Sequence, residues 1–260
     1  MASFFHYEKF EQTAILTLDH PPANTWNLAV LDELADYLTR FEQDPSVRAI
    51  VMTGNGERYF SAGIDITLLA SLEQEKAQTL FAAFHRTFNA IRKFSGITLA
   101  AVNGYALGAG LEWALASDFI VAERGSVLGM PQARFGLLPL AGGGKALTDK
   151  VGVSWAKRMM LAGEWIDAET AYRIGLIEEI VNSGVAKIMA ISLANKTCRQ
   201  GPEAVKAGNE LIDASQYLDH EAYTEYEKKL WLKLFGSAEQ QEGIAAFLEK
   251  RPPAWLGYSE

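Results

Sequence analysis

The chain has 260 residues, 49% of them hydrophobic, and a formal net charge of −8, with no basic cluster that would suit a nucleic-acid surface. This length allows one large domain or two small ones with a substantial core. Cys198 is the only cysteine, which excludes an internal disulfide and favours a reducing compartment such as the cytoplasm. The four histidines lack metal-ligand spacing, so no metal site is predicted.

The first quarter of the chain alternates between strand-like and helix-like segments. Residues 4–10 and 14–19 are typical of a hairpin. Regularly spaced apolar residues from Leu28 predict a helix that ends before Pro45, and residues 49–53 predict a short buried strand. This alternation indicates the α/β class.

A second helical region follows Asp65, which suits the N-cap position better than a catalytic one. Apolar side chains recur along this region at helical spacing, and we expect them to face the core rather than a ligand. These residues are Phe81, Phe84, Phe88 and Ile91.

The most informative stretch runs from Leu99 to Ala122. It predicts a strand over 99–102, a turn at Asn103-Gly104, a run of small residues, and a helix over 111–116 before another strand. Glu112 is a single acidic residue in the first turn of that helix, where free N–H groups and the helix dipole favour a carboxylate. On local grounds Glu112 is either such a helix-start charge or a catalytic group.

Towards the C-terminus the pattern changes. Residues 127–129 predict a short strand, and the glycine-rich segment 136–144 is expected to be irregular, with a helix from about Lys145. The glycine runs lack the spacing of a P-loop or a dinucleotide fingerprint, so a nucleotide cofactor is not expected. From about Ile188 only helices are predicted, with Pro202 at one helix start and a capping box of Ser237 with Gln240 at another. Residues 218–235 carry more apolar surface than one helix needs.

Two short segments rich in small residues stand out, Ser61-Ala62-Gly63-Ile64-Asp65 and the run from Gly104 to Gly110. Each follows a predicted strand and leads into a helix. Two such turns can present a pair of backbone N–H groups to an enolate or a tetrahedral oxyanion. Small side chains let a substrate carbonyl approach the main chain closely. Together with Glu112, the two segments predict an oxyanion-stabilising site.

The chain resembles the crotonase family, the enoyl-CoA hydratase/isomerase superfamily. The resemblance rests on SAGID at 61–65, AAVNGYALGAGLE at 100–112, PQARFGLLPLAGGG at 131–144 and LAGEWIDAETAYRIGLIEEIV at 161–181. It implies an α/β crotonase (ClpP-like) fold, in which repeated ββα units form a spiral core over residues 1–196. It also implies that the helical region 197–260 assembles the protein into homotrimers or homohexamers.

The family resemblance also implies roles for individual residues. The backbone N–H groups of Ile64 and Ala109 would form the oxyanion hole. Glu112 would hold and deprotonate the water that attacks the β-carbon of an enoyl thioester. The second catalytic glutamate of the hydratases is replaced by Gln132, which can hold a water but cannot donate and recover a proton. Three activities therefore remain open: enoyl-CoA hydratase, double-bond isomerase using Glu112 alone, and a silent acyl-CoA-binding subunit.

In this family coenzyme A is part of the substrate, so no separate cofactor is expected. The resemblance places the coenzyme A cradle at Ala23, Asn24, Ala62 and Ile66. Thr67 stands where the hydratases often carry a basic residue, which removes one phosphate contact. Arg58, or Lys250 and Arg251 near the C-terminus, are the candidates to replace it, although solvated surface charge is the simpler interpretation for each. The expected partner is an acyl-CoA thioester, with no nucleic acid and no membrane.

Overall fold

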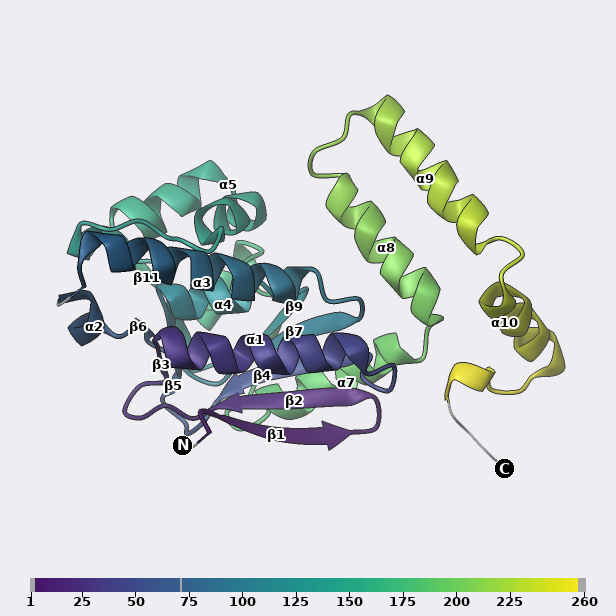
Figure 1. Ribbon diagram of the computed structural model, residues 1–260, viewed down its shortest axis with the longest axis horizontal. Helices are drawn as coiled ribbons and strands as arrows, with labels where there is room; N and C mark the ends of the chain where they lie inside the picture. Colours follow the sequence, from purple (N-terminus) through teal and green to yellow (C-terminus); the bar gives the residue numbers. More distant parts are fainter. Residues whose placement is uncertain (1–2, 71, 257–260) are drawn as a thin grey trace. The chain divides into compact units, whose positions relative to one another are not determined.

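The structure is a computed structural model that describes residues 3–70 and 72–256. The chain divides into two compact units, Met1–Ala194 and Asn195–Glu260. The outermost parts of the two domains proposed from the sequence, residues 1–2 and 257–260, lie outside the described residues. The first unit holds the strands and the helices labelled α1 to α6 (Figure 1).

The first unit begins with the predicted hairpin, formed by β1 (Phe5–Phe10) and β2 (Thr13–Leu18). The two strands pair antiparallel, from Phe5 opposite Leu18 to Phe10 opposite Thr13. Strand β2 is almost entirely buried, whereas β1 buries only Phe5. The hairpin therefore supplies one edge strand and one interior strand to the main sheet.

Three sheets organise this unit. The largest has the order β1-β2-β4-β7-β9-β12, and every pair in it after the hairpin is parallel. Its further strands are β4 (Ala49–Gly54), β7 (Ile97–Val102), β9 (Phe119–Glu123) and β12 (Glu179–Val181). The second sheet has the order β11-β10-β8-β5, and a third pairs β3 with β6. Their strands are β5 (Tyr59–Ser61), β8 (Tyr105–Leu107), β10 (Val127–Gly129), β11 (Trp165–Asp167), β3 (Thr25–Trp26) and β6 (Gly63–Ile64).

The chain passes through these sheets as a repeating ββα unit. The successive pairs β4–β5, β7–β8 and β9–β10 each contribute one strand to the large sheet and one to the second sheet, and a helix follows each pair. Such a connection returns the chain to the same end of the sheet, as parallel strands require. The first-unit helices are α1 (Leu28–Gln43), α2 (Ile66–Ala70), α3 (Gln74–Arg92), α4 (Ala109–Leu115), α5 (Gly143–Leu161) and α6 (Ala168–Arg173). The strand-to-helix turns of these repeats bring together segments far apart in sequence.

Helices α1 and α3 lie side by side along the unit (Figure 1), and the Thr87 hydroxyl of α3 donates to the Leu31 carbonyl of α1. One prediction about α3 was wrong. Phe84, Phe88 and Ile91 are buried as expected, but Phe81 is 52% exposed and Leu80 occupies the core position instead. The reason is helical geometry, because Leu80 is one full turn before Phe84 and shares its face.

The remaining helices are α7 (Ala186–Cys198), α8 (Pro202–Ala214), α9 (His220–Leu234) and α10 (Ala238–Glu249). The described part of the second unit contains helices and no strand. Pro202 opens α8, and the Ser237 hydroxyl accepts the N–H of Gln240 at the start of α10, as the sequence predicted. Several large apolar side chains of α9 and α10 remain exposed within the monomer: Trp231, Leu232, Ile244, Phe247 and Leu248.

Candidate active site

Glu112 lies in the interior of the first unit with no exposed surface. It belongs to α4, whose residues are all buried, and which begins at Ala109 after the positive-φ residue Gly108. The sequence placed the helix start two residues later. A fully buried carboxylate is costly unless it is hydrogen-bonded, so its partners define the site.

Two segments distant in sequence contact the Glu112 carboxylate. The Gln132 Nε2 amide donates to Oε2 at 3.1 Å, and the Gly143 backbone N–H donates to Oε1 at 3.2 Å. Gln132 opens a 3₁₀ turn after β10, and Gly143 is the first residue of α5. A Cβ at position 143 would lie 2.2 Å from the Glu112 Cγ, so only glycine allows this approach. The predicted irregular loop therefore ends at Gly142, and α5 begins at Gly143, two residues before the predicted helix start.

Burial raises the pKa of Glu112 from its ordinary 4.5 to about 7. Loss of solvent is the largest effect, and it outweighs four stabilising contacts with the charged form. These contacts are the N–H groups of Gly143 and Leu140, the Gln132 amide and the charge of Arg92. A carboxyl group with a pKa near neutrality can both accept and return a proton, which is what a general acid–base catalyst needs.

The other end of the Gln132 amide, its oxygen Oε1, does not contact Glu112. Its Nε2 faces a carboxylate, which only accepts hydrogen bonds when ionised, so Oε1 must point away from Glu112. Oε1 is buried and has no hydrogen-bond partner among residues 3–70 and 72–256. Because an unsatisfied buried acceptor is unfavourable, this oxygen is suited to accept a hydrogen bond from a bound water or hydroxyl group.

The two predicted oxyanion donors lie on adjoining segments. As the first residue of α4, Ala109 has an N–H that the helix itself cannot use, at the positive end of the helix dipole. The N–H of Asp65 donates to the Trp26 carbonyl on β3, so the preceding N–H, that of Ile64, points away from β3. Gly63 joins the two segments: with φ +95°, a Cβ there would lie 3.3 Å from the Ala109 nitrogen.

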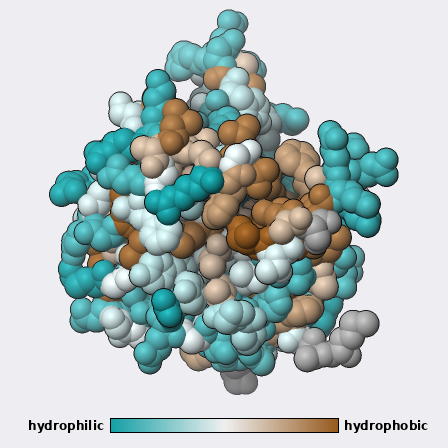
Figure 2. Space-filling model, turned by 90° about the vertical axis from the view of Figure 1, so that its left-hand side faces the viewer, coloured by the Kyte–Doolittle hydropathy of each residue, from teal (hydrophilic) through white to brown (hydrophobic). Residues whose placement is uncertain are grey.

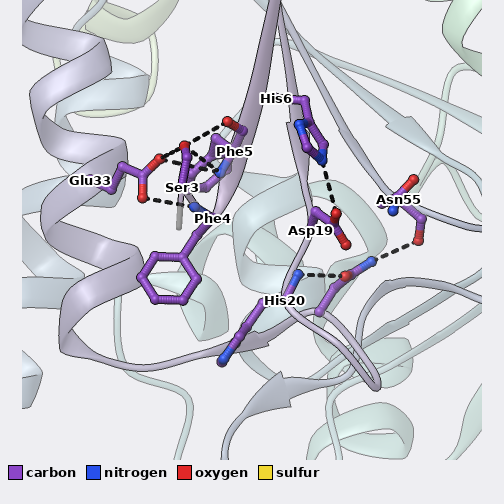
Figure 3. Close-up of polar contacts among 9 residues, drawn as sticks. Ser3, Phe4, Phe5, His6, Asp19, His20, Glu33 and Asn55 are labelled. Carbon is purple, nitrogen blue, oxygen red and sulfur yellow. Dashed lines mark hydrogen bonds and ion pairs between the residues drawn. The ribbon is translucent and has the colours of Figure 1, made fainter. Parts of the chain in front are cut away.

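The residues proposed for the coenzyme A cradle fall into one connected region. The Ala62 N–H donates to the Ala23 carbonyl at 3.0 Å, which brings these two residues together. The Asn24 side chain accepts from the His20 N–H at 3.1 Å and donates to the Asn55 carbonyl at 3.1 Å (Figure 3). Asn24 thus holds the loop in shape with its side chain. Ile66 opens α2 and is half exposed.

The proposed basic contacts belong to the second unit. Arg251 forms ion pairs with Glu242 and Glu249, each at 2.6 Å, and Lys250 ends α10 in a left-handed conformation. In the first unit, Asp65 accepts hydrogen bonds from the N–H and the hydroxyl of Thr67, as a helix N-cap does. Thr67 therefore stabilises the start of α2, at the position where the hydratases often carry a basic residue.

Sequence reasoning did not select two residues that the structure places beside the site. Gly143 appeared only as part of an irregular glycine run, and Arg92 was not singled out at all. The Arg92 Nη2 donates to the Ala141 carbonyl at 2.7 Å, between Leu140 and Gly143, whose N–H groups contact Glu112. A single arginine at the end of an amphipathic helix carries no local signal for such a role.

Two structural features are absent from residues 3–70 and 72–256. No helix there is long and apolar enough to cross a membrane. No group of three or more histidine, cysteine, aspartate or glutamate side chains in the same ranges is arranged to hold a metal ion.

The family model for enoyl-CoA hydratase/isomerase matches residues 8–258. The 2,3-dehydroadipyl-CoA hydratase of Escherichia coli strain K12 is 37% identical over 95% of this chain and 96% of its own. DspI of Pseudomonas aeruginosa is 42% identical, with a TM-score of 0.93 over 97% of this chain and 96% of that one. The enoyl-CoA hydratase of Bacillus anthracis is 30% identical, with a TM-score of 0.94 over 98% of this chain and all of its own. These likenesses confirm the predicted crotonase fold, and the chain belongs to the enoyl-CoA hydratase/isomerase family of enzymes.

Proposed function

We propose that this protein hydrates a 2-enoyl-CoA thioester. The observation that carries the proposal is the fully buried Glu112 carboxylate, in the first turn of α4 and hydrogen-bonded to an amide whose buried oxygen has no partner among the described residues. The hydratase activity named for the Escherichia coli relative supports the same reaction class. Coenzyme A enters as part of the substrate, so the reaction needs no separate cofactor.

In this mechanism the thioester oxygen accepts hydrogen bonds from the N–H groups of Ile64 and Ala109. The Glu112 carboxylate removes a proton from a water as the water oxygen bonds to the β-carbon. The electron pair of the double bond moves to form an enolate, whose negative charge the two N–H groups stabilise. Protonated Glu112 then returns the proton to the α-carbon and is regenerated as the carboxylate. A pKa near 7 suits both halves of this cycle.

Gln132 has a positioning role in this scheme. Its Nε2 orients the Glu112 carboxylate, and its Oε1 accepts the second hydrogen of the attacking water. Since an amide does not exchange a proton as a carboxyl group does, Glu112 carries both proton transfers.

The substitution at Gln132 also favours a second candidate function, double-bond isomerisation. In that reaction Glu112 removes the α-proton of a 3-enoyl-CoA and returns it to the γ-carbon, so a single base suffices. The enolate intermediate and the two backbone donors are the same in both reactions. The observation in its favour is that Glu112 is the one carboxylate that the structure places in this cluster.

The surface near the site suits an acyl-CoA. Figure 2 shows hydrophobic side chains gathered across the middle of the face at the α2 and β11 end of the first unit. Exposed apolar residues of these elements include Ile66 and Trp165. We place the acyl chain on this apolar face and the nucleotide portion at Ala23, Asn24, Ala62 and Ile66.

Turnover of crotonyl-CoA, followed by loss of the enoyl thioester absorbance, tests the proposal. We expect hydration by the parent protein and its loss in Glu112→Gln, with acyl-CoA binding retained. Turnover of a 3-enoyl-CoA without hydration would favour the isomerase. Binding without turnover of either substrate would favour a silent acyl-CoA-binding subunit.

We further propose that the second unit assembles the protein into a homotrimer or homohexamer in the cytoplasm. The support is the exposed apolar surface of α9 and α10, including Trp231 and Phe247, which exceeds what a soluble monomer usually presents. Light scattering at micromolar concentration should report three or six subunits. A monomeric mass would contradict the proposal.

A further inference from the structure

Arg92 joins helix α3 to the segment that contacts Glu112. It is the last residue of α3 and is half-buried. Its Nη2 donates to the Ala141 carbonyl at 2.7 Å. A Cβ added at Gly142 would lie 3.5 Å from the same nitrogen, so the guanidinium lies against two consecutive residues of the segment.

This segment places the donors of the Glu112 carboxylate. Leu140 and Gly143 both direct backbone N–H groups to Glu112, and they flank the two residues that Arg92 touches. Residues 140–142 of the segment belong to the irregular stretch 136–142, so regular secondary structure does not hold them in place before α5 begins at Gly143. The Arg92 hydrogen bond supplies an anchor from a different element.

Arg92 also acts on Glu112 through its charge. Burial lowers the pKa of the guanidinium, but arginine remains protonated throughout the physiological range. The groups that favour the charged form of Glu112 are two backbone N–H groups, the neutral Gln132 amide and Arg92. Arg92 is the one charged side chain among them.

We propose that Arg92 is a positioning residue for the reaction, which anchors the Ala141 carbonyl so that the Gly143 N–H group reaches Glu112. The inference rests on the proposed function in that it makes Glu112 the base. It extends that proposal by naming a residue outside the family motifs that holds the hydrogen-bond donors of the base in place.

Four variants separate the anchor from the charge. Arg92→Lys keeps a charge and a donor, Arg92→Gln keeps a donor without charge, and Arg92→Met removes both. Arg86→Met is the matched control, because Arg86 lies on the same helix but is exposed and pairs with Asp32 at 3.2 Å. It removes one arginine from α3 without touching the segment before α5.

The readout is the titration of the Glu112 carboxyl group by carbon NMR in protein labelled at glutamate, with the signal assigned by its absence in Glu112→Gln. We expect the parent, Arg92→Lys and Arg86→Met to share a midpoint near 7. In Arg92→Met the Glu112 carboxyl group should titrate at a pH higher by roughly 0.5 to 1 unit. Loss of a nearby opposite charge typically raises the pKa of a carboxyl group by about 1 unit or more. Arg92→Gln should fall between the parent and Arg92→Met. The acid limb of the pH profile for hydration should move in the same order.

A folded Arg92→Met protein whose Glu112 titrates as in the parent overturns the inference, whatever its activity. If Arg92→Met does not fold, the comparison of Arg92→Lys with Arg92→Gln decides, and equal midpoints for these two overturn it. The proposed function is tested separately. It fails if the parent protein does not hydrate crotonyl-CoA, even when substitution of Arg92 still shifts the titration of Glu112. Circular dichroism establishes the folded state of each variant.

Discussion

The Gln132 Nε2 amide donates a hydrogen bond to Oε2 of Glu112 at 3.1 Å, inside the first unit. The contact pairs a fixed donor with a carboxylate whose pKa burial has raised to about 7. A glutamate at position 132 would instead put two carboxyl groups against one another, and they would share a proton at neutral pH. The identity of residue 132 therefore decides how many groups can transfer protons at this site.

Gln132→Glu changes the proton chemistry with little change in volume. The added carboxyl group could protonate the α-carbon while Glu112 deprotonates the water. We expect hydration of crotonyl-CoA at saturation to rise at least roughly tenfold, equivalent to about 1.4 kcal/mol of barrier. Parallel rate measurements on parent and variant check this. A fast parent enzyme that the substitution slows would show instead that the glutamine has a positive role.

Glu112→Gln should alter the pH dependence of stability. The pKa of Glu112 is about 7 in the folded protein and about 4.5 when exposed. Between these values the folded state binds more protons than the unfolded state, so the stability of the parent falls as pH rises through this window. The contribution is of the order of 3 kcal/mol at most, at about 1.4 kcal/mol per pH unit.

The measurement is the free energy of unfolding of parent and Glu112→Gln at pH 5 and pH 8. The variant should gain stability relative to the parent on going to pH 8, even though glutamine cannot accept both of the hydrogen bonds that the carboxylate receives. A difference between the two proteins that does not change with pH would mean that Glu112 titrates normally.

Gly143→Ala should displace the Glu112 carboxylate. The added methyl group would lie 2.2 Å from Cγ and 2.5 Å from Oε1 of Glu112, and neither can move easily in a buried site. We expect a loss of stability of about 1–3 kcal/mol, as overpacking typically causes, and a marked fall in turnover. Gly125→Ala is the matched control, because no atom lies within 4 Å of the added carbon there. Thermal unfolding and crotonyl-CoA turnover of both variants are compared, and equal behaviour would contradict the close packing at Gly143.

Ile64→Pro should remove one oxyanion donor. Its N–H points away from β3, so no pairing within that sheet is lost with it. Loss of one such donor typically lowers turnover by about 10²–10³-fold. Ile64→Ala keeps the N–H and should keep most of the activity. Circular dichroism controls for strain from proline, and full activity in a folded Ile64→Pro protein would remove Ile64 from the oxyanion hole.

The sequence alone determined the elements whose signals are local. Alternating and helical apolar spacing, with Pro45 and Pro202 as boundaries, located the hairpin, the central strands and most helices close to their observed limits. The small-residue turns at 61–65 and 104–110 and the acidic residue after them were enough to indicate the family. These features are readable because the residues that produce them are neighbours in the chain.

Tertiary structure decided the chemical state of the site. Whether Glu112 is a helix-start charge or a buried base depends on what covers it, and the covering groups come from Gln132 and Gly143, 20 and 31 residues further along. Packing between elements likewise decided that Leu80 and not Phe81 is buried in the core. It also brought Arg92 within hydrogen-bond distance of the Ala141 carbonyl. Burial and long-range hydrogen bonds set a pKa, and neither is encoded in any short stretch of sequence, because both arise only when distant segments exclude water together.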